Sequence, residues 1–552
     1  MEEDCNFQYS SMLLQGFPEE EIQETGLENR EASHQTGLSL DMNLMEFWRC
    51  GRFQKQQSQR EIPGPAALPF LGNLKDLRQQ YLHVRLTELA KRFGPIYRLR
   101  AWREEIVVLN NTELIKEALL KRSCEFAGRP ENITGKAISF GGKDLSLGGY
   151  TRVWKLQKKL AYSAIHQSRA SDLEPVVERE ARKLCEVFQS YVGSPVDISR
   201  DFSISTCNVI SSLIFGTEYE RNDPELRVIH DCLVELVRLW NSPSITLLDM
   251  FPILQHFPNS TWKAFLKEVK KRDSFVTQQI DSHKVREYVS ISVQEKCFTL
   301  ALKGLVTFQK GKVRDITDAL MKHFWDQEED AAELEELTEE HIHMVIVDLF
   351  VGGTETTSST LGWAIAFLVH RPEIQDRIKQ EICEMVGEDC YPAYADRKKL
   401  PVLSATITEV LRLRPVVPIS IMHRTTCDTS VAGYFIPKET NVITNLFGAH
   451  HDESKWPEPT HFRPERFLEA ADTERAMQSV LSFSLGARTC LGESFARVEL
   501  FIFLAYLLKE FQFMPDVQGD PIDLQGQPGT VLRVKPHLVS IVRRPAPQHA
   551  QQ

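Results

Sequence analysis

The spacing of apolar residues changes along the chain. Between about residues 110 and 390, apolar positions recur at intervals of three and four, as on the buried face of a helix. Residues 86–111, LTELAKRFGPIYRLRAWREEIVVLNN, instead predict a helix, a Gly-Pro turn and two strands. Residues 429–446 predict two short strands around a Pro-Lys-Glu turn, and residues 530–545 predict another pair. We therefore expect a mainly α protein with small peripheral β-sheets.

The same pattern divides the chain into one large domain and atypical segments. Residues 1–58 are acidic and polar, which predicts a disordered lead without a signal peptide or a membrane anchor. Residues 59–545 are expected to form a single domain, followed by a short tail at 546–552. Residues 288–309 have a strand-like composition within a charged helical stretch, and we expect an irregular surface insertion there. The sequence has no run of about eighteen apolar residues, so no transmembrane helix is predicted.

Charge and cysteine content narrow the class of protein. The 552 residues carry a net charge of −11 and include no long basic run, which argues against nucleic-acid binding. The 11 cysteines are scattered and form no CxxC pair, which suits a reducing environment better than a disulfide framework. If a cysteine has a functional role, we therefore expect it to act singly and not as part of a disulfide or a CxxC pair.

One cysteine lies in a loop with unusual composition, FSLGARTCLG at residues 483–492. Two glycines allow a tight turn in which backbone amides can point at the sulfur of Cys490, and such hydrogen bonds stabilise a thiolate. A strongly helical run begins after Gly492, and the positive end of a helix dipole is expected to lower the pKa of a nearby thiol. An isolated cysteine is usually a small buried apolar residue, but this loop favours a thiolate ligand.

Residues 483–492 resemble the haem-binding loop of the cytochrome P-450 family, and the resemblance of the chain to this family extends over roughly residues 60–545. It implies haem b as the cofactor, the single large domain of that family and a haem-thiolate monooxygenase activity. By the same resemblance, Cys490 is the axial ligand of the haem iron and Arg488 contacts a haem propionate.

A second group of residues is consistent with this resemblance. The segment EVLRLRP places Glu409 and Arg412 three residues apart on one predicted helix, and FRPERF supplies Arg466. Taken alone, a Glu-x-x-Arg pair would be a surface ion pair worth little. In this order before the cysteine loop, the three residues match the family's buried structural triad, which implies a scaffolding role.

The longest apolar run, residues 337–373, predicts a helix that Thr338 can cap. Its two central glycines, Gly352–Gly353, either mark a helix kink or let a flat ligand approach the backbone. Glu355 and Thr356 follow directly, and a carboxylate with a hydroxyl can relay protons. The family's oxygen-activating groove has this pattern, which implies catalytic roles for both residues.

Cations are needed for the two haem propionates. YTRVWKLQKKL resembles the family's Trp-x-x-x-basic helix and implies that Trp154 and Lys158 lie beside a propionate. Arg129 in FAGRPE and His423 in IMHRTT match further propionate contacts. The alternative for the lysines is a solvated basic face. Both can hold, because a basic face near the cysteine would steer an acidic redox partner, implied to be NADPH-dependent cytochrome P-450 reductase.

Longer matches, including DLSLGGYTRVWK, VDLFVGGTETT and EVLRLRPVVP, resemble the branch of the family that hydroxylates steroids at carbon 21. They imply progesterone and 17α-hydroxyprogesterone as substrates, O2 as co-substrate and the cytosolic face of the endoplasmic reticulum membrane as location. By resemblance Arg272 reaches the steroid 3-ketone, and the cavity is lined by Trp240, Ser146 and Asp348. From local sequence, Arg272 is equally compatible with a surface run, Lys-Lys-Arg-Asp.

Three other functions remain open at this level. The first two are a steroid 17α-hydroxylase/17,20-lyase and a broad xenobiotic monooxygenase of the same fold. The third is a non-catalytic haem or steroid carrier, against which Cys490, Glu355 and Thr356 argue because a carrier would not need them.

Overall fold

The structure is a computed structural model, and the described residues are 61–101, 104–295, 313–325, 337–471, 473–516 and 521–545. The predicted lead at 1–58, the tail at 546–552 and the part of the predicted insertion at 296–309 lie outside the described residues. All described residues fall in one compact unit, Gln59–Gln552.

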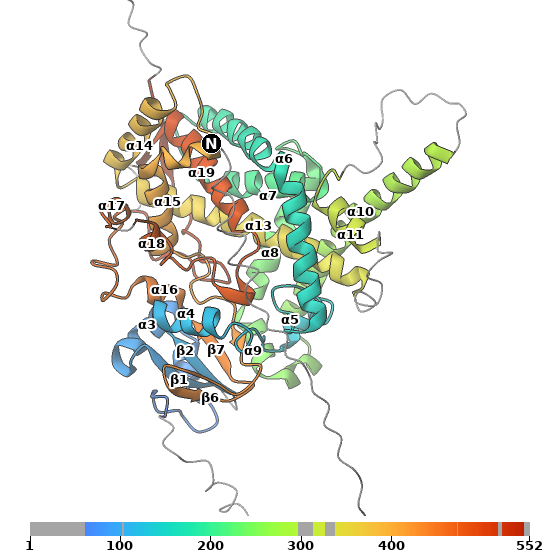
Figure 1. Ribbon diagram of the computed structural model, residues 1–552, viewed down its shortest axis with the longest axis vertical. Coiled ribbons are helices and arrows are strands. Elements are labelled where there is room, and N and C mark those ends of the chain that lie inside the picture. The colour runs from blue at the N-terminus through green and yellow to red at the C-terminus, as the bar shows by residue number, and fades with distance from the viewer. Residues whose placement is uncertain are drawn as a thin grey trace, which may run out of the picture. The chain divides into compact units, whose positions relative to one another are not determined.

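Helix α13 (Glu339–Leu368) runs through the middle of the fold (Figure 1). Its 30 residues correspond to a length of about 45 Å at a rise of about 1.5 Å per residue. Thr338 is its N-cap residue, as predicted, and the Thr338 backbone N–H donates to Nδ1 of His341 over 3.1 Å. Apolar residues are buried all around the helix, which is typical of a helix inside a core.

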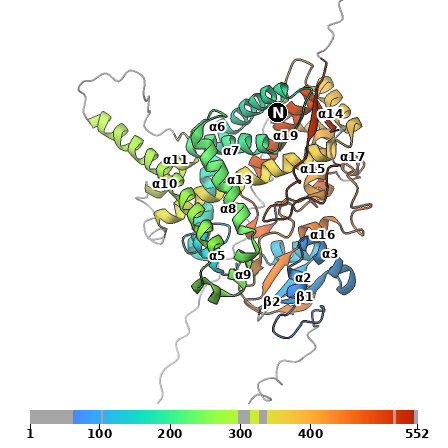
Figure 2. The same cartoon turned by 180° about the vertical axis from the view of Figure 1, so that it is seen from behind.

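Long helices surround α13 on several sides (Figures 1 and 2). Helix α7 packs along α13, α6 packs against α19, and α8 packs against α10. Their bounds are α6 (Arg152–Ser190), α7 (Ser199–Phe215), α8 (Pro224–Trp240), α10 (Ser260–Glu295) and α19 (Glu493–Glu510). The other helical segments are α2 (Leu74–Leu77), α3 (Leu82–Phe93), α4 (Thr112–Lys116), η1 (Glu117–Lys121), α5 (Ile133–Ile138), α9 (Pro243–Met250), η2 (Pro252–His256), α11 (Ile316–Trp325), α14 (Pro372–Met385), η3 (Tyr394–Lys398), α15 (Pro401–Leu413), α16 (Leu446–His450), α17 (Glu465–Leu468), α18 (Thr473–Met477) and η4 (Gly486–Arg488).

Three small sheets complete the described fold. The largest has the order β1-β2-β7-β4, in which β2 pairs antiparallel with β1 and parallel with β7. The others have the orders β3-β9-β8 and β5-β6. The strands are β1 (Ile96–Ala101), β2 (Glu104–Leu109), β3 (Pro195–Val196), β4 (His423–Arg424), β5 (Thr429–Val431), β6 (Tyr434–Ile436), β7 (Asn441–Thr444), β8 (Phe511–Pro515) and β9 (Val539–Arg543). The prediction of a mainly α fold with small sheets is confirmed, as are the helix and two strands within 86–111.

The two strand regions predicted after residue 428 are each confirmed in part. Strands β6 and β7 lie on either side of the predicted Pro-Lys-Glu turn, but they do not pair with each other. Strand β6 instead forms a hairpin with β5, which turns at Ala432 and Gly433 with φ angles of 51° and 78°. Strand β7 then leaves this hairpin and buries all four of its residues in the larger sheet. Within 530–545 only β9 forms, and its partner β8 comes from the end of α19. Pro536 explains this, because a proline cannot donate to a strand ladder.

The predicted insertion also differs in part. The backbone of residues 288–295 continues helix α10, so the expectation of irregular structure is wrong there. Its β-branched residues lower helix propensity only slightly, and extending an existing helix needs no new nucleation.

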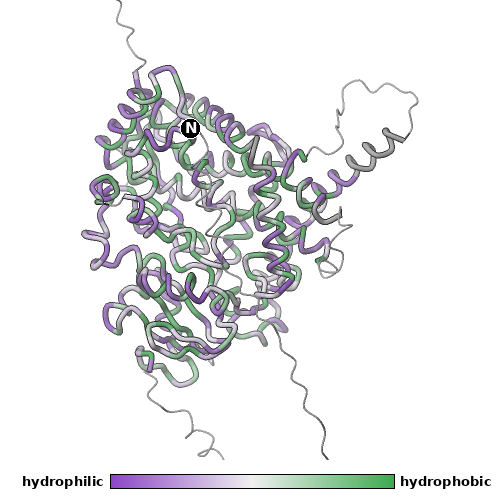
Figure 3. Tube along the Cα trace, viewed as in Figure 1, coloured by the Kyte–Doolittle hydropathy of each residue, from purple (hydrophilic) through white to green (hydrophobic). Residues whose placement is uncertain are grey.

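The apolar core is centred on α13 and α19, which contribute residues such as Trp363, Ile365 and Phe503. Strongly hydrophilic stretches lie mainly on outer helices and loops (Figure 3). In the part of the chain that the structure describes, no helix has both the length and the apolar content to cross a membrane.

Candidate functional site

The loop before α19 has a conformation that depends on glycine. Gly486 has a φ of +69°, and a Cβ atom there would lie 1.7 Å from the carbonyl oxygen of Leu119. The next amide, of Ala487, donates to Oγ of Ser123 over 2.7 Å. The Cys490 amide then donates to the carbonyl oxygen of Phe483 over 3.0 Å, which closes the loop. The cysteine is thereby held two residues before Gly492, the N-cap of α19.

The environment of Cys490 combines burial with hydrogen-bond donors. Burial has the largest effect and raises the pKa of the thiol, while the backbone N–H groups of Gly492 and Glu493 and the charge of Lys158 lower it. The expected net lowering of this pKa is therefore wrong, because burial outweighs the amides and the helix end. Cys490 keeps accessible surface in spite of this burial, so its sulfur can be reached by a ligand. A bound metal would deprotonate the thiol irrespective of this balance.

Three cations are enclosed around the loop without carboxylate partners. Among the described residues, Arg129, Lys158 and Arg488 form no ion pair, and their guanidinium and ammonium groups donate to backbone carbonyls. The accepting carbonyls belong to Ser146, Ile421 and Met422 for Arg129, to Ala487 for Lys158, and to Ala127, Leu145 and Gly148 for Arg488. Burial lowers the pKa of Arg488 to about 10, and burial with the charge of Arg488 lowers that of Lys158 to about 8.

The two remaining predicted propionate residues border these cations. The Trp154 ring lies 3.8 Å from Cζ of Arg488, and its Nε1 donates to the carbonyl oxygen of Leu145 over 3.1 Å. Nδ1 of His423 faces the carbonyl oxygen of Phe126 at 2.8 Å, while its buried Nε2 has no hydrogen-bond partner among the described residues. Burial lowers the pKa of His423 well below its usual value, so the ring is neutral.

These features suit a cofactor that carries carboxylates. Buried positive charge without a counter-ion is costly, and an anion between the cations would offset that cost. An anion would also favour the charged form of His423, whose Nε2 would then become a donor. The donor set of one thiolate and several cations therefore fits haem, which needs an axial ligand and partners for two propionates.

Helix α13 has an open position at its centre. Gly352 is exposed although Phe350 and Thr354 on either side of it are buried, and a Cβ atom there would meet nothing within 4 Å. The helix is continuous through this point, so the two glycines do not break it. Oγ1 of Thr356 donates to the carbonyl oxygen of Gly352 over 2.6 Å. A flat ligand could therefore lie against the backbone beside the Thr356 hydroxyl.

The side chains of Glu355 and Thr356 have different hydrogen-bond and ion-pair partners. Its Oε1 is 2.6 Å from Nε of Arg533, and within the described ranges no hydrogen bond joins the Glu355 and Thr356 side chains. Burial raises the pKa of the Glu355 carboxyl, and the charge of Arg533 opposes the rise. The two residues are adjacent in α13, but their side chains are not hydrogen-bonded to each other.

The three predicted triad residues are in contact. Arg412 donates to Glu409 from Nε over 2.7 Å and from Nη2 over 2.9 Å, and Nε of Arg466 lies 3.1 Å from both carboxylate oxygens. The side chains are 0%, 0% and 6% exposed for Glu409, Arg412 and Arg466. Arg412 also donates to the carbonyl oxygen of His450 over 2.7 Å, which connects the triad to the segment before the cysteine loop.

The predicted substrate residues form two neighbouring groups, Arg272 with Trp240 and Asp348 with Ser146. Arg272 is 1% exposed, so its interpretation as part of a surface run is wrong. Its Nη2 donates to the carbonyl oxygen of Ile138 over 2.8 Å, and Ile138 belongs to the apolar cluster against which Trp240 packs. The carboxylate of Asp348 accepts from Oγ of Ser146 over 2.6 Å, and the charge of Arg272 acts on its pKa.

Sequence reasoning missed the main-chain segment that joins these two groups of residues. The carbonyl oxygen of Leu145 accepts from both Trp154 and Arg488, and the Leu145 amide donates to Oδ2 of Asp348 over 2.6 Å. Leu145 thus links the cysteine loop to α13 through main-chain atoms, which carry no residue-specific signal. The glycines on either side, in GGKDLSLGG, are the one feature that indicates a constrained loop.

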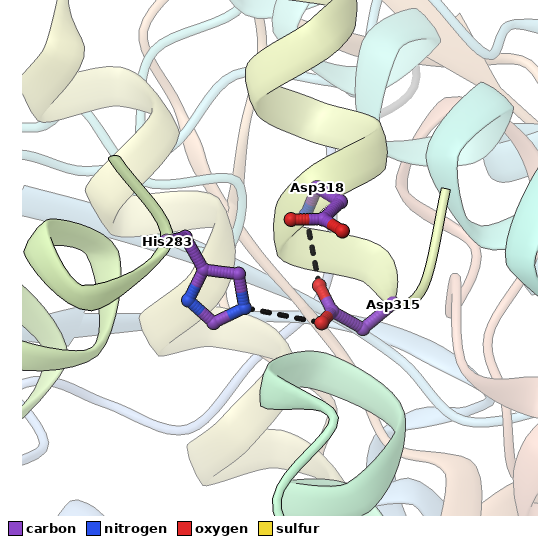
Figure 4. A group of neighbouring side chains, drawn as sticks. All are labelled: His283, Asp315 and Asp318. Atoms are coloured by element: carbon purple, nitrogen blue, oxygen red, sulfur yellow. Dashed lines mark hydrogen bonds and ion pairs between the residues drawn. The ribbon is translucent and has the colours of Figure 1, made fainter. Parts of the chain in front are cut away.

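A separate cluster of titratable residues joins α10 to α11 (Figure 4). Nε2 of His283 lies 3.1 Å from Oδ2 of Asp315, and Oδ1 of Asp315 accepts from the Asp318 amide over 2.8 Å. Arg314 donates to both oxygens of Asp318, over 2.6 and 2.7 Å. Burial lowers the pKa of His283, but the hydrogen bond and the charge of Asp315 raise it by more. The two carboxylates are thus neutralised by cations of the chain itself, and we assign no metal to them.

Comparisons with known proteins agree with this geometry. A family model described as Cytochrome P450 matches residues 62–541. Curated relatives named steroid 21-hydroxylase include one from Bos taurus, 40% identical over 481 residues, which cover 86% of this chain and 91% of the relative. The Homo sapiens relative of the same name is 39% identical over 489 residues, 87% of this chain and 93% of its own. A solved zebra fish cytochrome P450 with progesterone is 33% identical with a TM-score of 0.72, covering 83% of this chain and 99% of that one.

Proposed function

Since the chain belongs to the cytochrome P450 family, a family of haem-thiolate monooxygenases, we propose that it is a steroid 21-monooxygenase. It hydroxylates progesterone and 17α-hydroxyprogesterone at the C21 methyl group and gives 11-deoxycorticosterone and 11-deoxycortisol in corticosteroid biosynthesis. The relatives named steroid 21-hydroxylase support this reaction, because their similarity extends over most of both chains.

The observation that carries the steroid assignment is the burial of Arg272 beside an apolar cluster. A 3-keto steroid offers a flat apolar body and one ketone acceptor, and the site offers the complementary groups. The ketone would accept from the Arg272 guanidinium, while Trp240 and the cluster around Phe265 would contact the rings. A hydrogen bond to a charged donor is worth about 1.5–3 kcal/mol, which suffices to orient the ligand.

Haem, when bound, supplies the activation of O2 at its iron. Cys490 would hold the iron as thiolate, and the amides of Gly492 and Glu493 would donate to the sulfur and tune its electron density. The enclosed cations would hold the propionates. These cations are Arg129, Lys158 and Arg488, and the neutral His423 and the Trp154 ring beside Arg488 would border the propionates.

Two residues of α13 are proposed to handle protons. The Thr356 hydroxyl donates to the Gly352 carbonyl and can hold a proton at Oγ1 beside the open position of the helix. The Glu355 carboxyl is held near Arg533, and its raised pKa favours carrying a proton that it can pass on. Glu409, Arg412 and Arg466 act as scaffold, and residues 59–545 act as one catalytic domain.

The redox partner and the location complete the proposal. Lys155 and Lys159 are exposed on α6, next to Lys158, which donates to the cysteine loop. This basic face supports docking of an acidic electron donor, NADPH-dependent cytochrome P-450 reductase. The similarity to steroid 21-hydroxylases supports a location at the cytosolic face of the endoplasmic reticulum membrane.

The test is product analysis of the full chain, purified with haem and supplied with the reductase, NADPH and progesterone. We expect a single product that carries a hydroxyl group at C21. A product hydroxylated only at C17 would indicate a 17α-hydroxylase/17,20-lyase, and scattered products would indicate a broad monooxygenase. NADPH consumption without a hydroxylated steroid would indicate a carrier. In parallel, Cys490→Ser is expected to lose the Soret band typical of a thiolate ligand in the reduced carbon monoxide complex.

A further inference from the structure

We propose that Asp273 is the positioning residue for Arg272, and that it thereby sets how strongly the steroid site prefers a 3-keto ligand. The inference rests on the proposed function, because it concerns the donor that would meet the ketone. It adds a residue to which neither the sequence motifs nor the comparisons gave a role.

Asp273 holds one edge of the guanidinium. Its Oδ1 accepts from Nε of Arg272 over 2.9 Å and from Nη2 over 2.6 Å. The second hydrogen of Nη2 is directed to the carbonyl oxygen of Ile138 on α5 over 2.8 Å. Three hydrogen bonds from two nitrogens therefore fix the plane of the guanidinium as well as its position.

One donor of this guanidinium is left over. In the part of the chain that the structure describes, no hydrogen bond of Arg272 uses Nη1. The opposite edge is held by Asp273 and Ile138, so the direction of the two Nη1 hydrogens is set by these contacts. A ketone that approaches Nη1 would meet a donor that is already oriented, and orienting it in advance reduces the entropy lost on binding.

The pairing also selects a conformation of the arginine side chain. Arg272 and Asp273 are consecutive residues of α10, and consecutive residues of a helix point about 100° apart. Their contact therefore requires a particular conformation of the long arginine side chain, which Asp273 selects. The side chain of Arg272 is 1% exposed and that of Asp273 15% exposed, so the guanidinium is enclosed while its partner keeps a small accessible surface.

The carboxylate of Asp273 has a second buried neighbour. Nε2 of His343 on α13 lies 3.6 Å from Oδ1 of Asp273, and it has no hydrogen-bond partner among the described residues. The His343 ring is buried against the ring of Phe140, with 5.0 Å between the ring centroids. Oδ1 of Asp273 therefore lies close to both the guanidinium and a packed imidazole, which limits the motion of the carboxylate.

The test compares two ligands that differ only at carbon 3: progesterone and its 3-deoxy analogue. Their dissociation constants are measured by equilibrium dialysis with the full-chain holoenzyme, which requires no turnover. The readout is the ratio of the two constants. A merely structural role would weaken both ligands equally and leave this ratio unchanged.

For the wild type we expect progesterone to bind roughly 10- to 100-fold more tightly than the 3-deoxy analogue, the range for one hydrogen bond to a charged group. Asp273→Asn keeps the size of the side chain but not its charge, and is expected to reduce the ratio to about threefold or less. Asp273→Glu keeps the charge, moves the acceptor by one carbon and is expected to reduce the ratio as well. The second variant provides the answer if the first does not fold.

The matched control is Glu268→Gln. Glu268 is a buried carboxylate one turn earlier on α10 and accepts from Lys271 over 2.7 Å, so its loss perturbs the same helix without touching Arg272. This variant should keep the wild-type ratio. A wild-type ratio near one, or one that Arg272→Met leaves unchanged, would contradict the proposed role of Arg272 itself. A ratio that falls in Arg272→Met but persists in both Asp273 variants would overturn the positioning role alone.

Discussion

Removing the charge of Glu409 is expected to cost more stability than removing any exposed carboxylate. Its two oxygens accept from Arg412 over 2.7 and 2.9 Å, from Nε of Arg466 over 3.1 Å and from the Arg463 amide over 2.9 Å. Glu409→Gln keeps the shape but leaves two buried guanidinium groups without a counter-ion. It also turns an amide N–H₂ group towards N–H donors that previously met a carboxylate oxygen.

The expected size follows from burial. Glu409 and Arg412 are 0% exposed and Arg466 is 6% exposed, so water cannot replace the lost charge. Breaking a buried ion pair by neutralising one partner costs about 3–5 kcal/mol. The exposed pair of Lys91 and Glu453, 3.2 Å apart with side chains 68% and 72% exposed, is the matched comparison. Exposed pairs contribute about 0–1 kcal/mol, so Glu453→Gln should change stability little.

The assay is urea unfolding of both variants and the wild type, followed by far-ultraviolet circular dichroism and by tryptophan fluorescence. Coincident transitions would justify a single free energy of unfolding. Haem retention should fall as well, because Arg412 holds the carbonyl of His450, whose Nε2 accepts from the Leu481 amide over 2.7 Å just before the cysteine loop. A loss below about 1 kcal/mol for Glu409→Gln, equal to that for Glu453→Gln, would refute the reasoning.

Three further predictions test other parts of the structure. The pKa of His283 is raised beside Asp315. The stability that this histidine contributes is therefore complete below its unfolded pKa of about 6.5 and is lost as the pH rises through the folded value. His283→Gln should flatten that part of the curve of stability against pH. Burial raises the pKa of Asp348, so the folded state binds the proton of this carboxyl more tightly than the unfolded state does. Stability therefore falls as the pH rises above about 3.8. Asp348→Asn should remove this slope in the same measurement. Gly486→Ala would place a Cβ atom 1.7 Å from the carbonyl of Leu119, and the purified variant should lack the haem absorbance of the wild type.

The features that could be predicted from the sequence are those set by local residue patterns. Thr338 caps α13 as predicted, and the glycines around Cys490 form the expected tight loop, because caps and turns depend on adjacent residues. The pairing of β7 with β2 joins segments more than 300 residues apart, and no local pattern specifies such a partner. The contact between Glu355 and Arg533 has the same character, since helical spacing places Glu355 on a face but does not identify what that face meets.

Charge balance separates the two groups of buried arginines more clearly than sequence motifs do. Arg412 and Arg466 share the carboxylate of Glu409, so this group is electrostatically complete without any ligand, as suits a scaffold. Arg129 and Arg488 donate to neutral carbonyls, and burial and mutual repulsion lower the pKa of Arg129. Such an arrangement costs free energy in the protein alone and becomes favourable when an anion is added. The same residue type thus stabilises structure in one place and is proposed to bind a ligand in the other, and the difference lies in whether the chain places a carboxylate in direct contact with the guanidinium groups.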